Sequence, residues 1–124
     1  MSKRKNANIL GHAVLTALCL AALPLTALAQ VEKTADGVIV PAGDAFVSVT
    51  VRADDVIHVQ SARDKAFFTH TSVAALPRTG PAPKFDVAST AATTTLSTAK
   101  VKAVIDLKTG AVTFQDAAGK PLLA

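Results

Sequence analysis

The chain has 124 residues, is 50% hydrophobic, and carries 13 basic and 9 acidic residues for a formal net charge of +4. This length predicts a single domain. Three of the basic residues lie at positions 3–5, and without them ten basic residues face nine acidic ones, for a net charge of +1. The charge therefore argues against a basic surface for nucleic acid.

The first 29 residues have the order of a secretory signal peptide. Lys3-Arg4-Lys5 precede a mostly apolar stretch over residues 9–23, and Ala27-Leu28-Ala29 forms a small-x-small cleavage site. A membrane-anchoring helix is the alternative, but Pro24 interrupts the apolar stretch and Ala27-Leu28-Ala29 follows at cleavage distance. We expect cleavage after Ala29 and a periplasmic or secreted product. Cleavage also removes the single cysteine, Cys19, so the mature chain can form no disulfide.

The first half of the mature chain predicts short strands separated by turns. Residues 30–36 are polar and are expected to be a flexible lead-in. The alternation is clearest over residues 45–52, where Val47, Val49 and Val51 share one face. The predicted strands are 37–41, 45–52 and 56–60, with turns at 42–44 and 53–55.

The middle of the chain is less regular. Phe67 and Phe68 interrupt a polar stretch, and residues 69–76 fit a further strand or an irregular cover. Three prolines in residues 77–83 exclude a central strand, because each proline removes a ladder donor. Residues 84–89 alternate again, and the threonine-rich residues 93–96 predict a strand near the surface.

Residues 100–123 predict a three-strand antiparallel meander. Every second residue from Val101 to Leu107 is apolar, which places these side chains on one face. Lys108-Thr109-Gly110 reads as a hairpin loop, with Gly110 where a positive φ is needed. Residues 116–119 predict a second turn, and Pro121 suits an edge strand.

Taken together, residues 37–124 predict one all-β domain, an antiparallel β-sandwich. Several short strands alternate with turn signals at even intervals. After residue 29 there is no helix-length apolar stripe with caps. We expect this sandwich domain to follow the cleavable signal helix of residues 1–29 and the lead-in of residues 30–36.

The most suggestive acidic pair is Asp54-Asp55. Two carboxylates can perform acid/base chemistry on a glycosidic bond, but they must face each other across that bond. Neighbouring residues in a turn point apart, so we favour turn chemistry, with the Asp side chains bonding the local backbone.

The mature histidines and the paired phenylalanines are better explained by packing than by chemistry. His58 and His70 lack the further ligands or the Ser/Asp partners that a zinc or nucleophilic site needs, and His58 is expected to be half-exposed. Phe67-Phe68 could stack on a sugar, but we favour core or interface packing.

No catalytic, metal-ligating or cofactor-binding residue is predicted, and no residue can be assigned to carbohydrate binding. Nucleotide binding has no support, because the glycines are dispersed at turns rather than grouped in a phosphate-binding loop. These turn glycines are Gly37, Gly43, Gly80, Gly110 and Gly119.

The order of several short motifs resembles one known family. Asp54 to Gln60 reads Asp-Asp-Val-Ile-x-Val-Gln, Ser97 to Ile105 reads Ser-Thr-Ala-Lys-Val-x-x-x-Ile, and Val112 to Asp116 reads Val-x-Phe-x-Asp before Gly119-Lys120-Pro121-Leu122. This order is similar to the N-terminal β-sandwich of glycoside hydrolase family 31, which includes α-glucosidases and α-xylosidases. In that family the galactose-mutarotase-like sandwich precedes a catalytic (β/α)8 barrel. The family often carries Arg where His58 stands.

The resemblance implies a non-catalytic sandwich that contributes structure or weak carbohydrate contact. No catalytic residue carries over, because the family's two catalytic aspartates belong to the barrel. The family's sandwich continues where this chain reaches Ala124, so we expect a partial sandwich with a following barrel or a carbohydrate as its partner. The alternative is a standalone periplasmic β-sandwich that binds a protein partner or a glycan. An enzyme acting alone ranks last, because no acid/base pair, metal set or activated nucleophile can be assembled.

Overall fold

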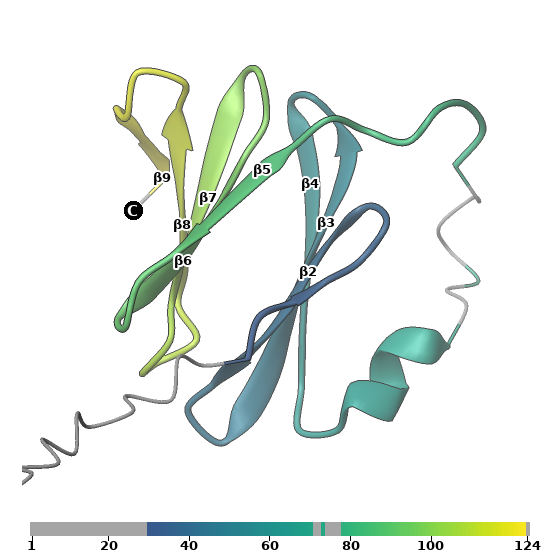
Figure 1. Ribbon diagram of the computed structural model, residues 1–124, viewed down its shortest axis with the longest axis vertical. Coiled ribbons are helices and arrows are strands. Elements are labelled where there is room, and N and C mark those ends of the chain that lie inside the picture. The colour runs from purple at the N-terminus through teal and green to yellow at the C-terminus, as the bar shows by residue number, and fades with distance from the viewer. Residues whose placement is uncertain (1–29, 71–72, 74–77, 124) are drawn as a thin grey trace, which may run out of the picture.

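The chain forms two antiparallel β-sheets in a computed structural model that describes residues 30–70, 73 and 78–123 (Figure 1). The predicted signal peptide, residues 1–29, lies outside the described residues. The first sheet holds β1 (Glu32–Lys33), β2 (Gly37–Ala42), β3 (Ala45–Ala53) and β4 (Val56–Ala62). The second holds β5 (Asp86–Ser89), β6 (Thr93–Ser97), β7 (Val101–Asp106), β8 (Val112–Asp116) and β9 (Pro121–Leu123).

Each sheet is a meander in which consecutive strands are neighbours, in the orders β1-β2-β3-β4 and β5-β6-β7-β8-β9. Tight turns allow this pattern, because antiparallel neighbours can be joined by very short loops. Gly110, in the loop between β7 and β8, has a φ of +76° as predicted. β4 is the last strand of the first sheet, and β5 is the first strand of the second (Figure 1).

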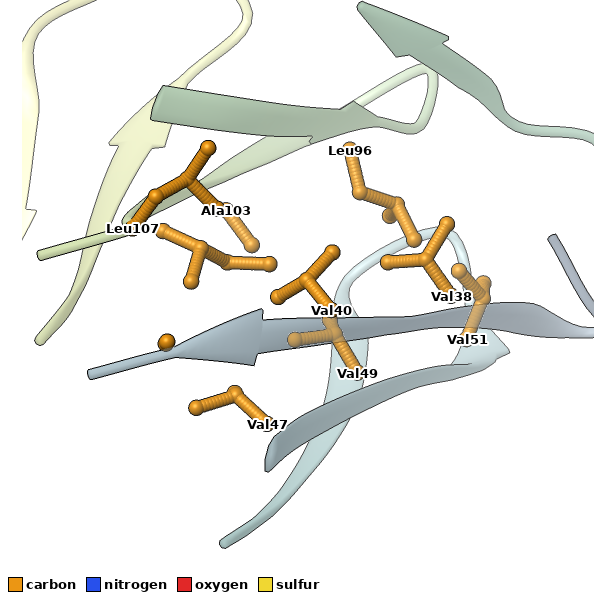
Figure 2. Close-up of a cluster of buried hydrophobic side chains, with 10 residues drawn as sticks. Val38, Val40, Val47, Val49, Val51, Leu96, Ala103 and Leu107 are labelled. Carbon is orange, nitrogen blue, oxygen red and sulfur yellow. The ribbon is translucent and has the colours of Figure 1, made fainter. Parts of the chain in front are cut away.

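The core lies between the two sheets. In the first sheet Val38 pairs with Val49 and Val40 with Val47, so alternate residues of β2 and β3 share one face. Figure 2 shows these valines pointing toward Leu96, Ala103 and Leu107 of the second sheet. Residues from both sheets are thus buried together, which confirms the predicted all-β sandwich. The buried apolar residues are Val38, Val40, Ala42, Val47, Val49, Val51, Leu96, Ala103, Ile105 and Leu107.

The predicted hairpin over residues 45–60 and the meander over residues 100–123 are both confirmed. Ile57 and Val59 of β4 pack against the core, while His58 is half-buried on the opposite face. β9 is an edge strand in which Pro121 pairs with Gln115 of β8. Proline is tolerated there because its missing N–H faces away from the ladder.

The position of β6 differs from the prediction. Thr94 and Leu96 are fully buried, so this strand is not near the surface. β6 lies between β5 and β7, and its contacts extend to β2 in the other sheet. A threonine can take such a place only if its hydroxyl is bonded, and the Thr94 hydroxyl lies 3.1 Å from that of Ser89.

Two further segments contain structure that the sequence did not predict. Residues 30–36 include β1, whose Glu32 and Lys33 pair with Ile39 and Val38. Lys65–Thr69 forms a 3-10 helix, η1, which begins where the Asp64 carboxylate accepts a 2.9 Å hydrogen bond from the Ala66 N–H. Most of the segment 69–76, expected as a strand or a cover, lies outside the described residues.

Candidate functional site: a basic groove at one end of the sandwich

The Asp54-Asp55 pair lies in the β3–β4 turn, as predicted. The Thr98 hydroxyl, in the β6–β7 connection, donates to the Asp54 carbonyl oxygen. The Asp55 carboxylate lies 3.6 Å from Lys100 Nζ, and both side chains are exposed. In the described structure the turn is not held by the expected hydrogen bonds between the Asp54 and Asp55 side chains and the local backbone. The turn instead ties the first sheet to the second.

The two histidines do not meet. His58 pairs with Thr50 across the first sheet, and His70 is exposed at the end of η1. Within residues 30–70, 73 and 78–123, no group of three or more His, Cys, Asp or Glu side chains could hold a metal ion. No helix in the described part of the chain is long and apolar enough to cross a bilayer.

Phe67 and Phe68 form an aromatic corner on η1 rather than part of the core. Their ring centroids are 6.1 Å apart in an edge-to-face arrangement, and His70 lies 6.4 Å from Phe67. Phe67 is 52% exposed, so the expectation of core packing is wrong for this residue. Interface packing of Phe67-Phe68 stays a prediction.

A groove lies at one end of the sandwich, and we call it the end groove. It has a volume of about 1050 Å³ and is lined by residues 33–35, 52–54, 97–99 and most of 78–86. This volume lies at the upper end of the range for small-molecule sites, about 300–1,000 Å³. Figure 1 shows the segment before β5 crossing the end of the sandwich where the β3–β4 turn lies.

Contacts between distant segments fix the walls of the end groove. The Val51 N–H donates to the Asp36 carbonyl oxygen over 2.7 Å, and Thr98 is bonded to Asp54. Lys33 Nζ, from the first sheet, lies 5.1 Å from the ring centroid of Phe85, which precedes β5 of the second sheet. Phe85 also packs against the core. Both sheets and the segment before β5 therefore build the groove.

The lining of the end groove is rich in positive charge. Four cationic side chains line it, against the two carboxylates of Asp54 and Asp86. The ion pairs present among the described residues are Lys65–Glu32 and Lys100–Asp55, and neither involves a charged side chain of the groove. The four cations are Lys33, Arg52, Arg78 and Lys84.

Sequence reasoning did not find this groove. Its four cations come from three parts of the chain, β1, β3 and the segment before β5, and none has another basic residue next to it in the sequence. The only local signal was the proline-rich segment before β5, which predicted an irregular connection and now forms one wall.

The similarity of this chain to known proteins comes from solved structures. No protein-family model matches the chain, and no curated protein matches it. Among solved structures, the chain is similar to a glycoside hydrolase family 31 α-xylosidase from Xanthomonas citri, with 37% sequence identity and a TM-score of 0.65. The match covers 74% of this chain and 10% of that enzyme, so the chain spans about a tenth of the length of this relative.

Proposed function

Because this chain is a β-sandwich related to glycoside hydrolase family 31, we propose that it is a non-catalytic N-terminal sandwich segment of a secreted α-glycosidase of that family. The observation that carries the proposal is the 37% identity over 74% of the chain, at a TM-score of 0.65. At that identity the similarity extends beyond the shared fold to the sequence itself. In this proposal the sandwich is of the galactose-mutarotase type.

The proposed role is structural support of a catalytic domain. The exposed edge of the second sheet favours it. Leu122 and Leu123 of the edge strand β9 are 52% and 68% exposed, and Leu123 pairs with Phe114, which packs against the core. An exposed edge with apolar side chains is costly in water and is commonly covered by a neighbouring element.

Secretion is a second part of the proposal, and it rests on the signal-peptide order of residues 1–29. Cleavage after Ala29 would give a mature chain that begins at Gln30, close to β1. N-terminal sequencing of the protein recovered from the periplasm or the medium tests this part. A mature N-terminus at Gln30 supports it, and retention of Met1 on membrane-bound protein contradicts it.

A domain exchange tests the supporting role. The segment of the Xanthomonas citri α-xylosidase that matches this chain is replaced by residues 30–123, and hydrolysis of an aryl α-xyloside is measured. We expect the chimera to fold and to hydrolyse the xyloside, and this chain alone to release no sugar. A matched chimera carrying Leu96→Asp, which places a charge in the core, is expected to lose activity with the fold.

Two outcomes would contradict the proposal. Release of sugar by this chain alone would show that it is catalytic. An exchanged enzyme that is soluble and folded but inactive would show that this sandwich cannot support the barrel.

A standalone periplasmic sandwich that binds a protein partner or a glycan is the second candidate. The observation that favours it is the closed core, in which ten apolar side chains of both sheets are buried. No buried side-chain nitrogen or oxygen of the described residues lacks a hydrogen-bond partner. A single cooperative thermal transition of the purified chain would favour this candidate, and a broad melt with aggregation would favour the segment of a larger enzyme.

A further inference from the structure

The end groove combines positive charge with the features of a sugar-binding surface. Phe85, Pro81 and Pro83 contribute apolar surface to its lining. Such surface suits the C–H faces of a pyranose ring, as the walls of small-molecule sites are largely apolar with a few polar groups. Ser97 and Thr79 add hydroxyl groups to the same lining.

The cations of the groove surround this surface, and contacts hold two of them in place. Lys33 lies over the Phe85 ring from the first sheet, and the Arg78 guanidinium donates from Nη1 to the Pro81 carbonyl oxygen over 3.1 Å. Arg52 comes from β3 and Lys84 from the segment that leads into β5. The cations thus converge onto one hollow from the first sheet and from the segment before β5.

These cations exceed the carboxylates of the groove by two. Asp54 and Asp86 are its acidic residues, and within the described residues neither forms an ion pair with a cation of the groove. Like charges that share a concave surface repel one another, and the field in such a cleft attracts anions. An anionic group in the groove would relieve that repulsion.

We infer that the end groove is a binding site for an acidic oligosaccharide, one whose sugar rings carry carboxylates. Arg78 and Lys84 lie in the segment before β5, which forms one wall of the groove. They contact the carboxylates of the bound sugar. Pro81 and Pro83 contact the ring faces, beside Phe85, whose own ring packs against the core under Lys33. The inference goes beyond the proposed supporting role and does not require that the chain support a catalytic domain.

Binding of defined oligosaccharides to the purified chain tests the inference. The probes are tetragalacturonate, its methyl ester and xylotetraose, each titrated by calorimetry at low salt, with sulfate as an anion that has no sugar ring. We expect tetragalacturonate to bind and its neutral methyl ester and xylotetraose to bind at least about tenfold more weakly. Raising the salt concentration to about 0.5 M should weaken the tetragalacturonate complex, because exposed charges are then screened.

A charge-matched pair of variants locates the site. Arg78→Gln with Lys84→Gln removes two charges from the groove, whereas Lys108→Gln with Lys120→Gln removes two exposed charges from the hairpins of the second sheet. The groove variant is expected to bind tetragalacturonate about tenfold more weakly, and the hairpin variant to bind as the unaltered chain does. Matching circular dichroism spectra ensure that both variants are folded.

Each other outcome overturns the inference. If tetragalacturonate does not bind at millimolar concentration, the groove is not a binding site for it. If both double variants weaken binding equally, the effect comes from the overall charge and not from the groove. If xylotetraose binds as tightly as tetragalacturonate, the site is not specific for acidic sugars. If sulfate binds as tightly as tetragalacturonate, the groove binds anions without recognising a sugar. The domain exchange is read out as hydrolysis of a neutral xyloside, so its failure and a failure here are distinguishable.

Discussion

Gly37 lies so close to the backbone of β3 that a Cβ atom at this position would come within 2.0 Å of the Val49 carbonyl oxygen. The Thr50 Cα would lie 2.9 Å away. Gly37 is buried at the start of β2 and has no positive φ, so it is not a turn glycine as the sequence suggested. The other four glycines of that set do have positive φ. Close approach of two strands, rather than a turn, explains the glycine at position 37.

We therefore expect Gly37→Ala to destabilise the chain by about 1–3 kcal/mol, the usual cost of overpacking. The atoms that would have to move belong to the backbone of β3, which the core valines hold in place. Urea unfolding measures the change. Ser61→Ala, at an exposed position of β4, serves as the control and should stay within about 0.5 kcal/mol of the unaltered chain. Equal stability of the two variants would contradict this reading of Gly37.

A pair of identical substitutions tests where the core ends. Leu96 is fully buried between the sheets, whereas Leu122 on β9 is 52% exposed. Leu96→Ala should cost about 2–5 kcal/mol, because it removes apolar contacts and leaves a cavity. Leu122→Ala should cost less than about 1 kcal/mol. The free energies of unfolding come from urea titration, and a similar cost for both would mean that β9 is packed as tightly as β6.

The strands were predictable because their signal is local. Val47, Val49 and Val51 repeat with a period of two, and that period alone assigns their face. The same reasoning failed for Thr94. Its neighbours are threonines, so the local pattern predicts solvent, and its burial depends on the Ser89 hydroxyl supplied by an adjacent strand.

Neither the helix η1 nor the end groove was predicted from the sequence, and the reasons differ. Asp64 is a good N-cap residue, and its carboxylate does cap the turn, so a signal for η1 was present in the sequence. The groove had no such signal. Lys33 and Phe85 are distant in the chain. They meet because the segment before β5 crosses the end of the sandwich (Figure 1).

The hydrogen bond between Ser89 and Thr94 predicts a non-additive pair of substitutions. Ser89→Ala should cost about 1–3 kcal/mol, because the buried Thr94 hydroxyl would lose its partner. Thr94→Val removes that hydroxyl, so Ser89→Ala should cost little in a chain that already carries Thr94→Val. A double-mutant cycle by urea unfolding measures the coupling. Additive effects would show that the bond contributes nothing of its own.

Asp106 predicts a defined response to acid. Its Oδ1 accepts 2.8 Å hydrogen bonds from the backbone N–H groups of Thr109 and Lys108, in the loop between β7 and β8. These bonds, that from Thr109 first, lower the pKa of the Asp106 carboxyl below its ordinary value of 3.8. The folded chain thus holds the carboxylate more strongly than the unfolded chain does. The resulting stabilisation is complete above about pH 4 and is lost as the pH falls through the lowered pKa.

Two substitutions at Asp106 separate the charge from the hydrogen bonds. Asp106→Asn keeps an oxygen that can accept from Thr109 and Lys108 but cannot ionise, whereas Asp106→Ala loses both the charge and the acceptor. At pH 6 we expect the melting temperature to fall in the order unaltered chain, Asn variant, Ala variant. As the pH is lowered below about 4, the gap between the unaltered chain and the Asn variant should narrow, because the unfolded chain takes up its proton at Asp106 before the folded chain does. The measurement is thermal unfolding at each pH by circular dichroism, and a gap that stays constant down to pH 2.5 would show that the charge of Asp106 does not stabilise the loop.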